Sequence, residues 1–204
     1  ISSHESDPLL DRLLAAGIPT VSCGAPLGHQ GELSSVSVDE TASAKQMTRH
    51  LRDRGYRRIA MIAGPSDTPG GRFRLVGFRE EMGSDYDDSM VEVGDYGMES
   101  GAAAMSKLLA RHPDIDAVFA ASDLMAAGAV QALRRARRRV PQDVAVAGFD
   151  DSGLAESHEP PLTTMRQPWD RISEEMVALL LEVIAGAPPR AIVLPTTLVV
   201  RDSA

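Results

Sequence analysis

The sequence predicts an α/β protein in two lobes, with parallel, doubly wound sheets and helices on both faces. Short apolar stretches alternate with amphipathic stretches of about 10–15 residues along most of the 204-residue chain, the pattern of right-handed βαβ units. Three apolar stretches, at 59–64, 116–122 and 145–151, run directly into small, polar or acidic residues. Ligands bind such sheets where strand C-termini meet helix N-termini, so we expect one crevice at these three ends.

Helix caps and short β-rich runs divide the first part of the chain. One predicted helix runs from the Asp-Pro pair at 7–8 to the stop at Gly17. The next begins at Asp39 or Thr41, either of which is a suitable N-cap, and ends at Gly55. Strands are predicted around these helices over 19–23, 36–39 and 58–63.

The remaining elements follow from apolar periodicity. The glycine-rich segment 64–71 is interpreted as a mobile loop, because its glycines fit neither phosphate-binding spacing. Helices are then predicted over 73–82, 99–110, 124–136 and 168–184. Strands are predicted over 90–93, 117–120, 144–147, 162–166, 192–194 and 197–200.

The distribution of these elements indicates how the chain is divided. Those between 39 and 166 suffice for one complete sheet, whereas those outside supply few strands. We therefore predict a partial N-terminal lobe from residues 1–38 and 167–195, and a C-terminal lobe from residues 39–166 and 196–204. The partial lobe is expected to lack its opening strands, and a sequence that opens on Ile1 rather than Met is expected to be part of a longer protein.

Composition disfavours several classes of protein. The chain has 29 acidic and 21 basic residues and a net charge of −8, which repels phosphate backbones. The one basic cluster, at 134–139, is interpreted as solvated cations at a helix end, with a phosphate patch as the alternative. No apolar run reaches the roughly 20 residues of a membrane helix, so we expect no membrane partner. Cys23, the single cysteine, is interpreted as a buried free thiol, which fits a cytoplasmic location.

The sequence contains no recognisable arrangement of catalytic residues. The five histidines are scattered without metal-ligand spacing, and the chain has no nucleophile elbow, phosphate loop or dinucleotide fingerprint. An acid/base or metal pair at Asp150 and Asp151 is disfavoured, because adjacent side chains on a loop usually diverge. We therefore expect no catalytic residues, no metal and no cofactor.

Polar residues near the predicted crevice favour recognition of a small polar molecule. Arg72 and Arg74 flank Phe73 at a helix entry, and we expect both guanidiniums on one side with Phe73 in the core. Guanidinium donors suit vicinal hydroxyls or a carboxylate, Asp150 supplies acceptors, and Tyr96 offers an aromatic face to a sugar or purine. Taken singly, each residue is better explained by a solvated or core position, but the joint placement of these residues at βα ends favours a ligand site.

Ordered motifs cover nearly the whole chain. They lie at 17–19, 36–39, 50–65, 74–79, 94–101, 121–129, 140–151, 160–168 and 194–203. In this order they resemble the effector-binding and dimerisation core of LacI/GalR-type transcriptional regulators, which has a two-lobed, periplasmic-binding-protein-like fold. The Pro-Pro-Leu-Thr-Thr and Leu-Pro-Thr elements within the last two segments separate the chain from periplasmic sugar-binding proteins.

The resemblance implies an effector site in a cleft between two lobes that are joined by three crossovers. Arg74 and Asp150 match the family's effector-binding arginine and aspartate. Tyr96 matches an aromatic position that stacks on the ligand. Ser122 stands where many members have asparagine, so a hydroxyl contact replaces an amide contact.

Three further positions are implied by the same resemblance. Trp169 falls on a position that lines the pocket from the first lobe. Asp39 lies at a crossover and is expected to orient Arg74. Gly24 departs from the family, because the corresponding position is often acidic, and this departure disfavours a simple hexose-like ligand.

The family also dimerises along the flank of both lobes. The matching positions here are Ala126, Ala127, Val130, Leu154 and His158, and the alternative for the small apolar ones is the intramolecular core. The family's helix-turn-helix domain and hinge have no counterpart in this sequence. Operator DNA is therefore expected as a partner only through a missing N-terminal domain.

The resulting hypothesis is the effector-sensing domain of a LacI-type regulator, which binds a sugar or a related small polar metabolite. The first alternative is a sugar-binding protein of a transport system, which an upstream signal peptide would support. The second is an enzyme on the same fold, which the lack of a nucleophile–base or metal cluster disfavours.

Overall fold

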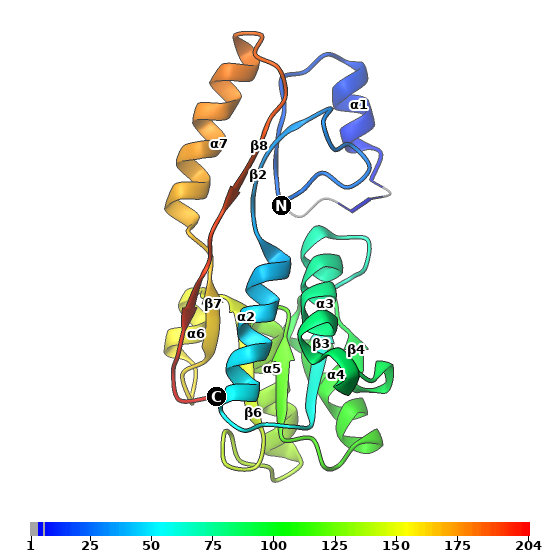
Figure 1. The fold of residues 1–204 in the computed structure, drawn as a ribbon, viewed down its shortest axis with the longest axis vertical. Coiled ribbons are helices and arrows are strands. Elements are labelled where there is room, and N and C mark those ends of the chain that lie inside the picture. The colour runs from blue at the N-terminus through cyan, green and yellow to red at the C-terminus, as the bar shows by residue number, and fades with distance from the viewer. Residues whose placement is uncertain (1–3, 6) are drawn as a thin grey trace.

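Two sheets lie one above the other along the long axis of the molecule (Figure 1). The computed structural model describes residues 4, 5 and 7–204. The larger sheet has the order β4 (Val91–Val93), β3 (Ile59–Ala63), β5 (Ala117–Ala120), β6 (Ala145–Asp150), β7 (Thr163–Arg166) and β9 (Thr197–Val199). The smaller sheet has the order β1 (Val21–Cys23), β2 (Ser34–Val38) and β8 (Ala191–Leu194). All neighbouring strands pair in parallel except β7 and β9, which are antiparallel.

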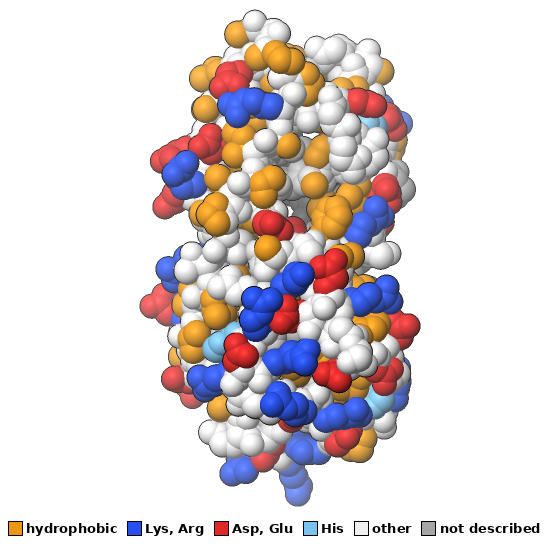
Figure 2. Space-filling view, viewed as in Figure 1, with side chains coloured by type: hydrophobic (Ala, Val, Ile, Leu, Met, Phe, Trp, Pro, Cys, Tyr) orange, Lys and Arg blue, Asp and Glu red, His pale blue; other side chains and the backbone are white. Residues whose placement is uncertain are grey.

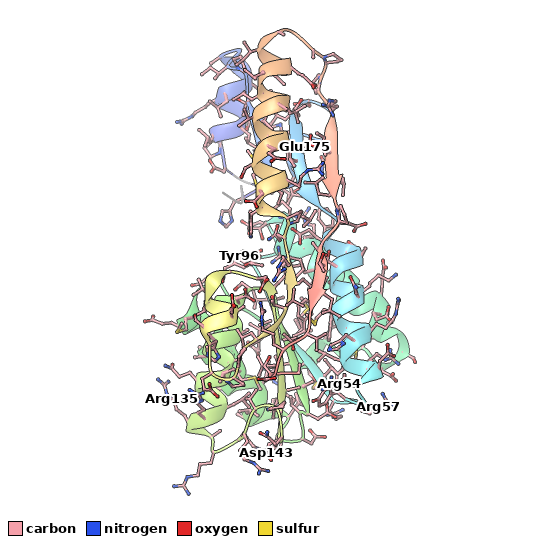
Figure 3. All side chains as sticks on the ribbon, turned by 90° about the vertical axis from the view of Figure 1, so that its left-hand side faces the viewer. Arg54, Arg57, Tyr96, Arg135, Asp143 and Glu175 are labelled. Atoms are coloured by element: carbon pink, nitrogen blue, oxygen red, sulfur yellow. The ribbon has the colours of Figure 1, made fainter. Side chains whose placement is uncertain are left out.

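Helices accompany the strands in the predicted alternation. Around the larger sheet lie α2 (Glu40–Asp53), α3 (Pro69–Met82), α4 (Met98–Arg111), α5 (Asp123–Arg135) and α6 (Gly153–Ser157), with short 3₁₀ turns at Gly83–Asp85 and Asp88–Met90. The sheet stands between α2 on one side and α5 and α6 on the other (Figure 3). Near the smaller sheet lie α1 (Leu9–Ala15) and α7 (Trp169–Ile184), and α7 packs on β1 and β2. We call the part around the larger sheet the large lobe and the part around the smaller sheet the small lobe.

The chain crosses between the two sheets three times. The crossings lie between β2 and α2, between β7 and α7, and between β8 and β9. Because three short segments connect the lobes, the simplest relative motion is a hinge bend about these segments. The crossings also pass beside the carboxyl ends of the large-sheet strands, where the sequence predicts the crevice.

The two lobes have cores of very different size. In the large lobe the central strands and both helix layers bury a continuous apolar cluster, which includes Met47, Met61, Phe78, Met105 and Phe119. The small-lobe cluster consists of Val36, Val38, Ile172, Leu179 and Leu194, packed between α7 and the sheet. The outer face of α7 exposes Val177, Leu181 and Ile184. The small lobe therefore has much less buried apolar surface to stabilise it.

Glycines allow α4 and α5 to approach very closely. A Cβ atom at Gly128 would lie 2.0 Å from the Met98 carbonyl oxygen, and one at Gly101 would lie 2.3 Å from the Met125 carbonyl oxygen. No side chain fits in these gaps, so the two helix backbones touch. This contact buries the alanines on the inner faces of both helices.

The structure differs from the predicted elements in three places. α3 begins at Pro69, so the end of the segment interpreted as a mobile loop is the first turn of a helix. Thr68 caps it, because its hydroxyl oxygen accepts a hydrogen bond from the Gly71 amide at 3.2 Å. α6 forms where no helix is predicted, and β6 continues three residues beyond the predicted end at 147.

The basic cluster lies where the sequence places it, at the end of α5. Arg138 donates to the Pro113 carbonyl oxygen at 2.5 Å, and Arg139 pairs with Asp143 through two nitrogens. Arg134 and Arg135 stand exposed in the last turn of α5, which fits the interpretation of the cluster as solvated cations at a helix end. Within residues 4, 5 and 7–204, no helix combines the length and the apolarity required to cross a membrane.

Candidate ligand-binding site

A cavity of about 490 Å³ lies between the two lobes. Figure 2 shows the surface hollowed at the level where the lobes meet. The large lobe lines it with Glu40, Pro69, Gly70, Arg74, Tyr96, Ser122, Leu124, Asp150 and Ser152. The small lobe and the crossings line it with Cys23, Gly24, Val36, Ser37, Val38, Gln167, Trp169 and Ile172. The volume is within the roughly 300–1,000 Å³ of typical small-molecule sites, and polar groups converge on one wall only.

Arg74 is the most constrained side chain of this wall. Its Nε donates to Glu40 Oε2 at 2.6 Å and one terminal nitrogen donates to Glu40 Oε1 at 3.2 Å. The other terminal nitrogen donates to the Ala121 carbonyl oxygen at 2.5 Å and lies 3.7 Å from Asp150 Oδ1. The guanidinium carbon also lies 3.5 Å from the centre of the Phe149 ring, a cation–π contact. Arg74 is thus held on every side before any ligand arrives.

The charge of Arg74 is secured by its neighbours. Burial alone would lower the pKa of its guanidinium, but the Glu40 and Asp150 carboxylates outweigh this effect and raise the pKa above its usual value. Asp150 is affected in the opposite sense. Burial raises the pKa of its carboxyl group, and the charge of Arg74 offsets only part of the rise.

Asp150 is presented to the cavity by an unusual backbone. It ends β6 with a φ of 106°, and Asp151 follows with a φ of 51°. Non-glycine residues in this region cost free energy, and such residues concentrate at functional sites. Gln167, on the crossing after β7, donates through Nε2 to Asp150 Oδ1 at 2.7 Å. The carboxylate is therefore fixed from two segments, its own strand end and a crossing.

Asp151 points away from Asp150, as expected for adjacent side chains on a loop. Arg166 Nε lies 2.5 Å from its Oδ2, and Arg201 lies 2.7 Å from its Oδ1. This buried carboxylate joins the strand end to β7 and to the segment after β9. The pair is therefore not an acid/base dyad, and within the described part of the chain no three His, Cys, Asp or Glu side chains are placed to hold a metal ion.

Ser122 and Asp123 begin α5 beneath the cavity. Ser122 Oγ accepts from the Met125 amide at 3.1 Å and donates to the Tyr96 carbonyl oxygen at 3.2 Å. Asp123 accepts from the Ser152 amide at 2.8 Å and from Thr164 Oγ1 at 2.7 Å. Burial raises the pKa of Asp123 to about 6, against these hydrogen bonds. Asp123 thus holds the loop after β6 in place, while Ser122 holds the backbone of Tyr96 and reaches the cavity wall.

Tyr96 lines the cavity from the loop after β4. Its φ is 70°, and its hydroxyl is 2.7 Å from Thr68 Oγ1. Gly64 leaves room for the ring, because a Cβ atom there would lie 2.4 Å from the ring carbon that bears the hydroxyl. The hydroxyl is therefore fixed at the N-cap of α3, and the side chain lines the cavity.

The small-lobe wall offers little polarity. Trp169, at the first position of α7, is 47% exposed beside the cavity. Cys23 ends β1 and is half-buried at the cavity wall, so its interpretation as a buried thiol is wrong. Gly24 follows with a φ of 96°, a left-handed conformation that suits glycine.

Two sequence-based expectations about arginine contacts are wrong. Asp39 does not orient Arg74; it caps α2 by accepting from the Ala42 amide at 2.9 Å and lies outside the lining of the cavity. Glu40, one residue later and turned about 100° around the helix axis, takes that place. Arg72 does not accompany Arg74, because alternate residues of a helix do not share a face. It pairs with Glu5 at the surface.

The expected dimer contacts are only partly at the surface. Ala126, Ala127 and Val130 are 0–3% exposed in the single chain, because the close approach of α4 and the sheet cover them. They offer no area to a partner, so their assignment to an interface is corrected to intramolecular core. Leu154 and His158 are half-buried, and His158 Nδ1 lies 3.0 Å from the Pro160 carbonyl oxygen.

Sequence reasoning missed four polar residues of the site, which are Ser37, Glu40, Ser152 and Gln167. Glu40 is hidden beside a better N-cap, and only the structure shows which carboxylate faces Arg74. Gln167 follows a strand in a segment predicted as a connection, so its contact to Asp150 has no local signal. Ser152 lies two residues after Asp150, in the loop that follows the same strand. Its place just after a strand end is the signal that could have identified it.

Comparisons with known proteins give one consistent result. Residues 48–204 match the family described as periplasmic binding protein-like domain. The HTH-type transcriptional regulator CelR of Thermobifida fusca is 47% identical over 209 residues, which covers all of this chain and 62% of the regulator, so the chain spans less than two thirds of that relative. The structure of a CelR–cellobiose complex superposes with a TM-score of 0.96 at 47% identity and covers 99% of this chain and 64% of the other. A LacI-family regulatory protein from Chloroflexus aggregans superposes with a TM-score of 0.87 at 31% identity, covering 98% and 74%.

Proposed function

Because the chain belongs to the LacI family of transcriptional regulators and has its periplasmic-binding-protein-like fold, we propose that it is the effector-sensing domain of such a regulator. The division into two lobes, at residues 38–39, 166–167 and 195–196, then allows the lobes to change their relative orientation. A ligand that contacts both lobes stabilises one relative orientation of the lobes. It acts through its difference in affinity for the two orientations.

The observation that carries this proposal is the prearranged polar wall. Arg74 and Asp150 are fixed side by side at strand and helix ends, and Tyr96 and Trp169 offer aromatic surface on opposite lobes. Fixed donors and acceptors beside aromatic rings suit a ligand with hydroxyl groups and apolar faces. Ser122 completes the proposed effector contacts. Asp39 is left out of them because it faces away from the cavity.

We propose that the effector is a sugar of the size of a disaccharide, with cellobiose as the first candidate. The 47%-identical regulator has been solved with cellobiose, and the superposition covers nearly all of this chain. The cavity of about 490 Å³ has room for more than one sugar ring. Gly24 supports the same choice, because it leaves open space where an acidic side chain would face a single hexose.

The output of the sensor belongs to the whole protein. We propose that it acts as a homodimer and that effector binding changes the affinity of a helix-turn-helix domain for operator DNA. The relatives support this, since they are HTH-type or LacI-family regulators. Leu154 and His158 remain the candidate dimer contacts. The alternatives of a transport solute-binding protein and of an enzyme are not favoured, because these relatives are transcriptional regulators.

Calorimetric titration with cellobiose tests the proposal. Arg74→Lys keeps the charge but loses the planar fork, so cellobiose affinity should fall about tenfold or more. Arg72→Lys is the matched control, because Arg72 lies two residues away and pairs with Glu5 at the surface, and its affinity should equal that of the wild type. Absence of heat with cellobiose and with other β-linked disaccharides would refute the proposed effector class.

A further inference from the structure

We infer that this site selects uncharged ligands and that Glu40 is the residue that imposes the selection. The inference rests on the proposed function, because it concerns the effector of the same cavity. A guanidinium in a sugar-sized pocket is by itself ambiguous, since it recognises a carboxylate or phosphate as readily as a pair of hydroxyls. The structure resolves the ambiguity through what Arg74 already holds.

The forked face of Arg74 is occupied from within the protein. Both oxygens of Glu40 accept from its Nε and one terminal nitrogen, at 2.6 and 3.2 Å. A third N–H is used by the Ala121 carbonyl oxygen. Of the five N–H groups of an arginine, two remain, one on each terminal nitrogen. The side-on fork of Nε and one terminal nitrogen is therefore closed to a ligand, and the two remaining N–H groups are available to hydroxyl oxygens.

The charges around the cavity point the same way. Arg74 is the single cation among the lining residues, and Glu40 and Asp150 are the two anions. The side chains of Arg74 and Glu40 are 6% and 13% exposed, and Asp150 lies 3.7 Å from the guanidinium. Glu40 by itself offsets the charge of Arg74, so this wall keeps no positive charge for an anionic ligand, and the carboxyl group of Asp150 adds none.

The remaining walls do not compensate. The small lobe contributes apolar, small and hydroxyl side chains, with Trp169 at the rim. An anion could pair with Arg74 only by displacing Glu40, and this would leave a carboxylate unpaired in a largely buried position, which is costly. Glu40 is in turn favoured where it stands, in the first turn of α2, because the N-terminal end of a helix stabilises an acidic side chain.

Two cellobiose analogues of equal shape and different charge test the inference. In one analogue a C6 hydroxymethyl group is replaced by a carboxamide, and in the other the same group is replaced by a carboxylate. The two analogues are prepared once with the change on the first sugar ring and once with the change on the second. Calorimetry on the wild-type protein should show the carboxamide bound about tenfold or more tightly than the carboxylate. In Glu40→Gln, which frees the charge of Arg74, the ratio should fall below about threefold.

Glu80→Gln is the matched control. It removes the same charge from the surface, where Glu80 pairs with Lys45, and it should keep the wild-type ratio. Thermal unfolding identifies a Glu40→Gln protein that has lost its fold, in which case Glu40→Ala is measured in its place. Equal affinity of the wild type for carboxylate and carboxamide would overturn the inference and leave the proposed function standing. If neither cellobiose nor the carboxamide binds, the result refutes the proposed effector rather than the selection by charge.

Discussion

The two lobes contribute opposite qualities to one cavity. The large lobe brings charged groups that are each fixed by several partners, as Arg74 is by Glu40 and Ala121. It rests on a continuous core between two helix layers. The small lobe brings apolar and small groups on a core of five residues. The contrast supports the proposal that the large lobe orients the ligand, while the small lobe, which costs less to move, encloses it.

The largest expected effect tests the rigidity of the large lobe. In Gly128→Ala the new Cβ would lie 2.0 Å from the Met98 carbonyl oxygen, so α4 and α5 must separate. We expect the free energy of unfolding in urea to fall by about 3 kcal/mol. Gly153→Ala is the control, because nothing lies within 4 Å of its Cβ position. If both variants unfold alike, the helix contact is not what makes this lobe rigid.

A smaller effect is expected in the small lobe. Leu179 is 1% exposed between α7 and the sheet, whereas Leu181, two residues later, is 62% exposed. Leu179→Ala should lower the unfolding free energy by about 2 kcal/mol, toward the lower end for such changes, because a small core relaxes readily. Leu181→Ala should change it by less than about 0.5 kcal/mol. A loss for Leu179→Ala as large as that for Gly128→Ala would remove the contrast between the lobes.

The smallest expected effect is a pH dependence confined to the large lobe. Burial raises the pKa of Asp123 from 3.8 to about 6. The folded state therefore holds this proton more tightly than the unfolded state, so the stability it gives is present below pH 4 and is lost as the pH rises through 6. The shift allows at most about 3 kcal/mol, and we expect about 1–2 kcal/mol because the site adjoins the solvated cavity.

Asp123→Asn removes this titration. The stability advantage of the wild type over the variant, measured by urea unfolding, should be larger at pH 4 than at pH 7. Asp143→Asn provides a comparison of opposite sign, because Arg139 holds the pKa of Asp143 below its usual range. An advantage for Asp123 that grows with pH would show that its hydrogen bonds outweigh burial.

The parts of the fold with strong local signals were predictable. The strand at 117–120 and the helix that Ser122 caps follow from an apolar run and a capping residue, and the structure places both there. α6 was missed because five residues carry too little periodicity. The start of α3 at Pro69 was missed because the glycines outweighed the Thr-Pro start signal at 68–69.

The candidate site was predictable as a set of segments but not as a set of contacts. Strand ends and resemblance brought Arg74, Tyr96, Ser122, Asp150 and Trp169 to one cavity. Which of two adjacent carboxylates, Asp39 or Glu40, meets Arg74 depends on the rotation of α2, which no sequence pattern records. For the alanines of α5, residue type alone cannot separate a dimer flank from a core, because both require small apolar side chains.

The position of Trp169 has a practical consequence. It is the single tryptophan of the chain, and it stands half in solvent at the start of α7, beside the cavity. The protein thus carries one tryptophan, which can be excited apart from its three tyrosines, at the edge of the proposed ligand site. Its emission should shift if a ligand or the proposed lobe motion takes the ring out of water, and this change can be followed in real time without a label.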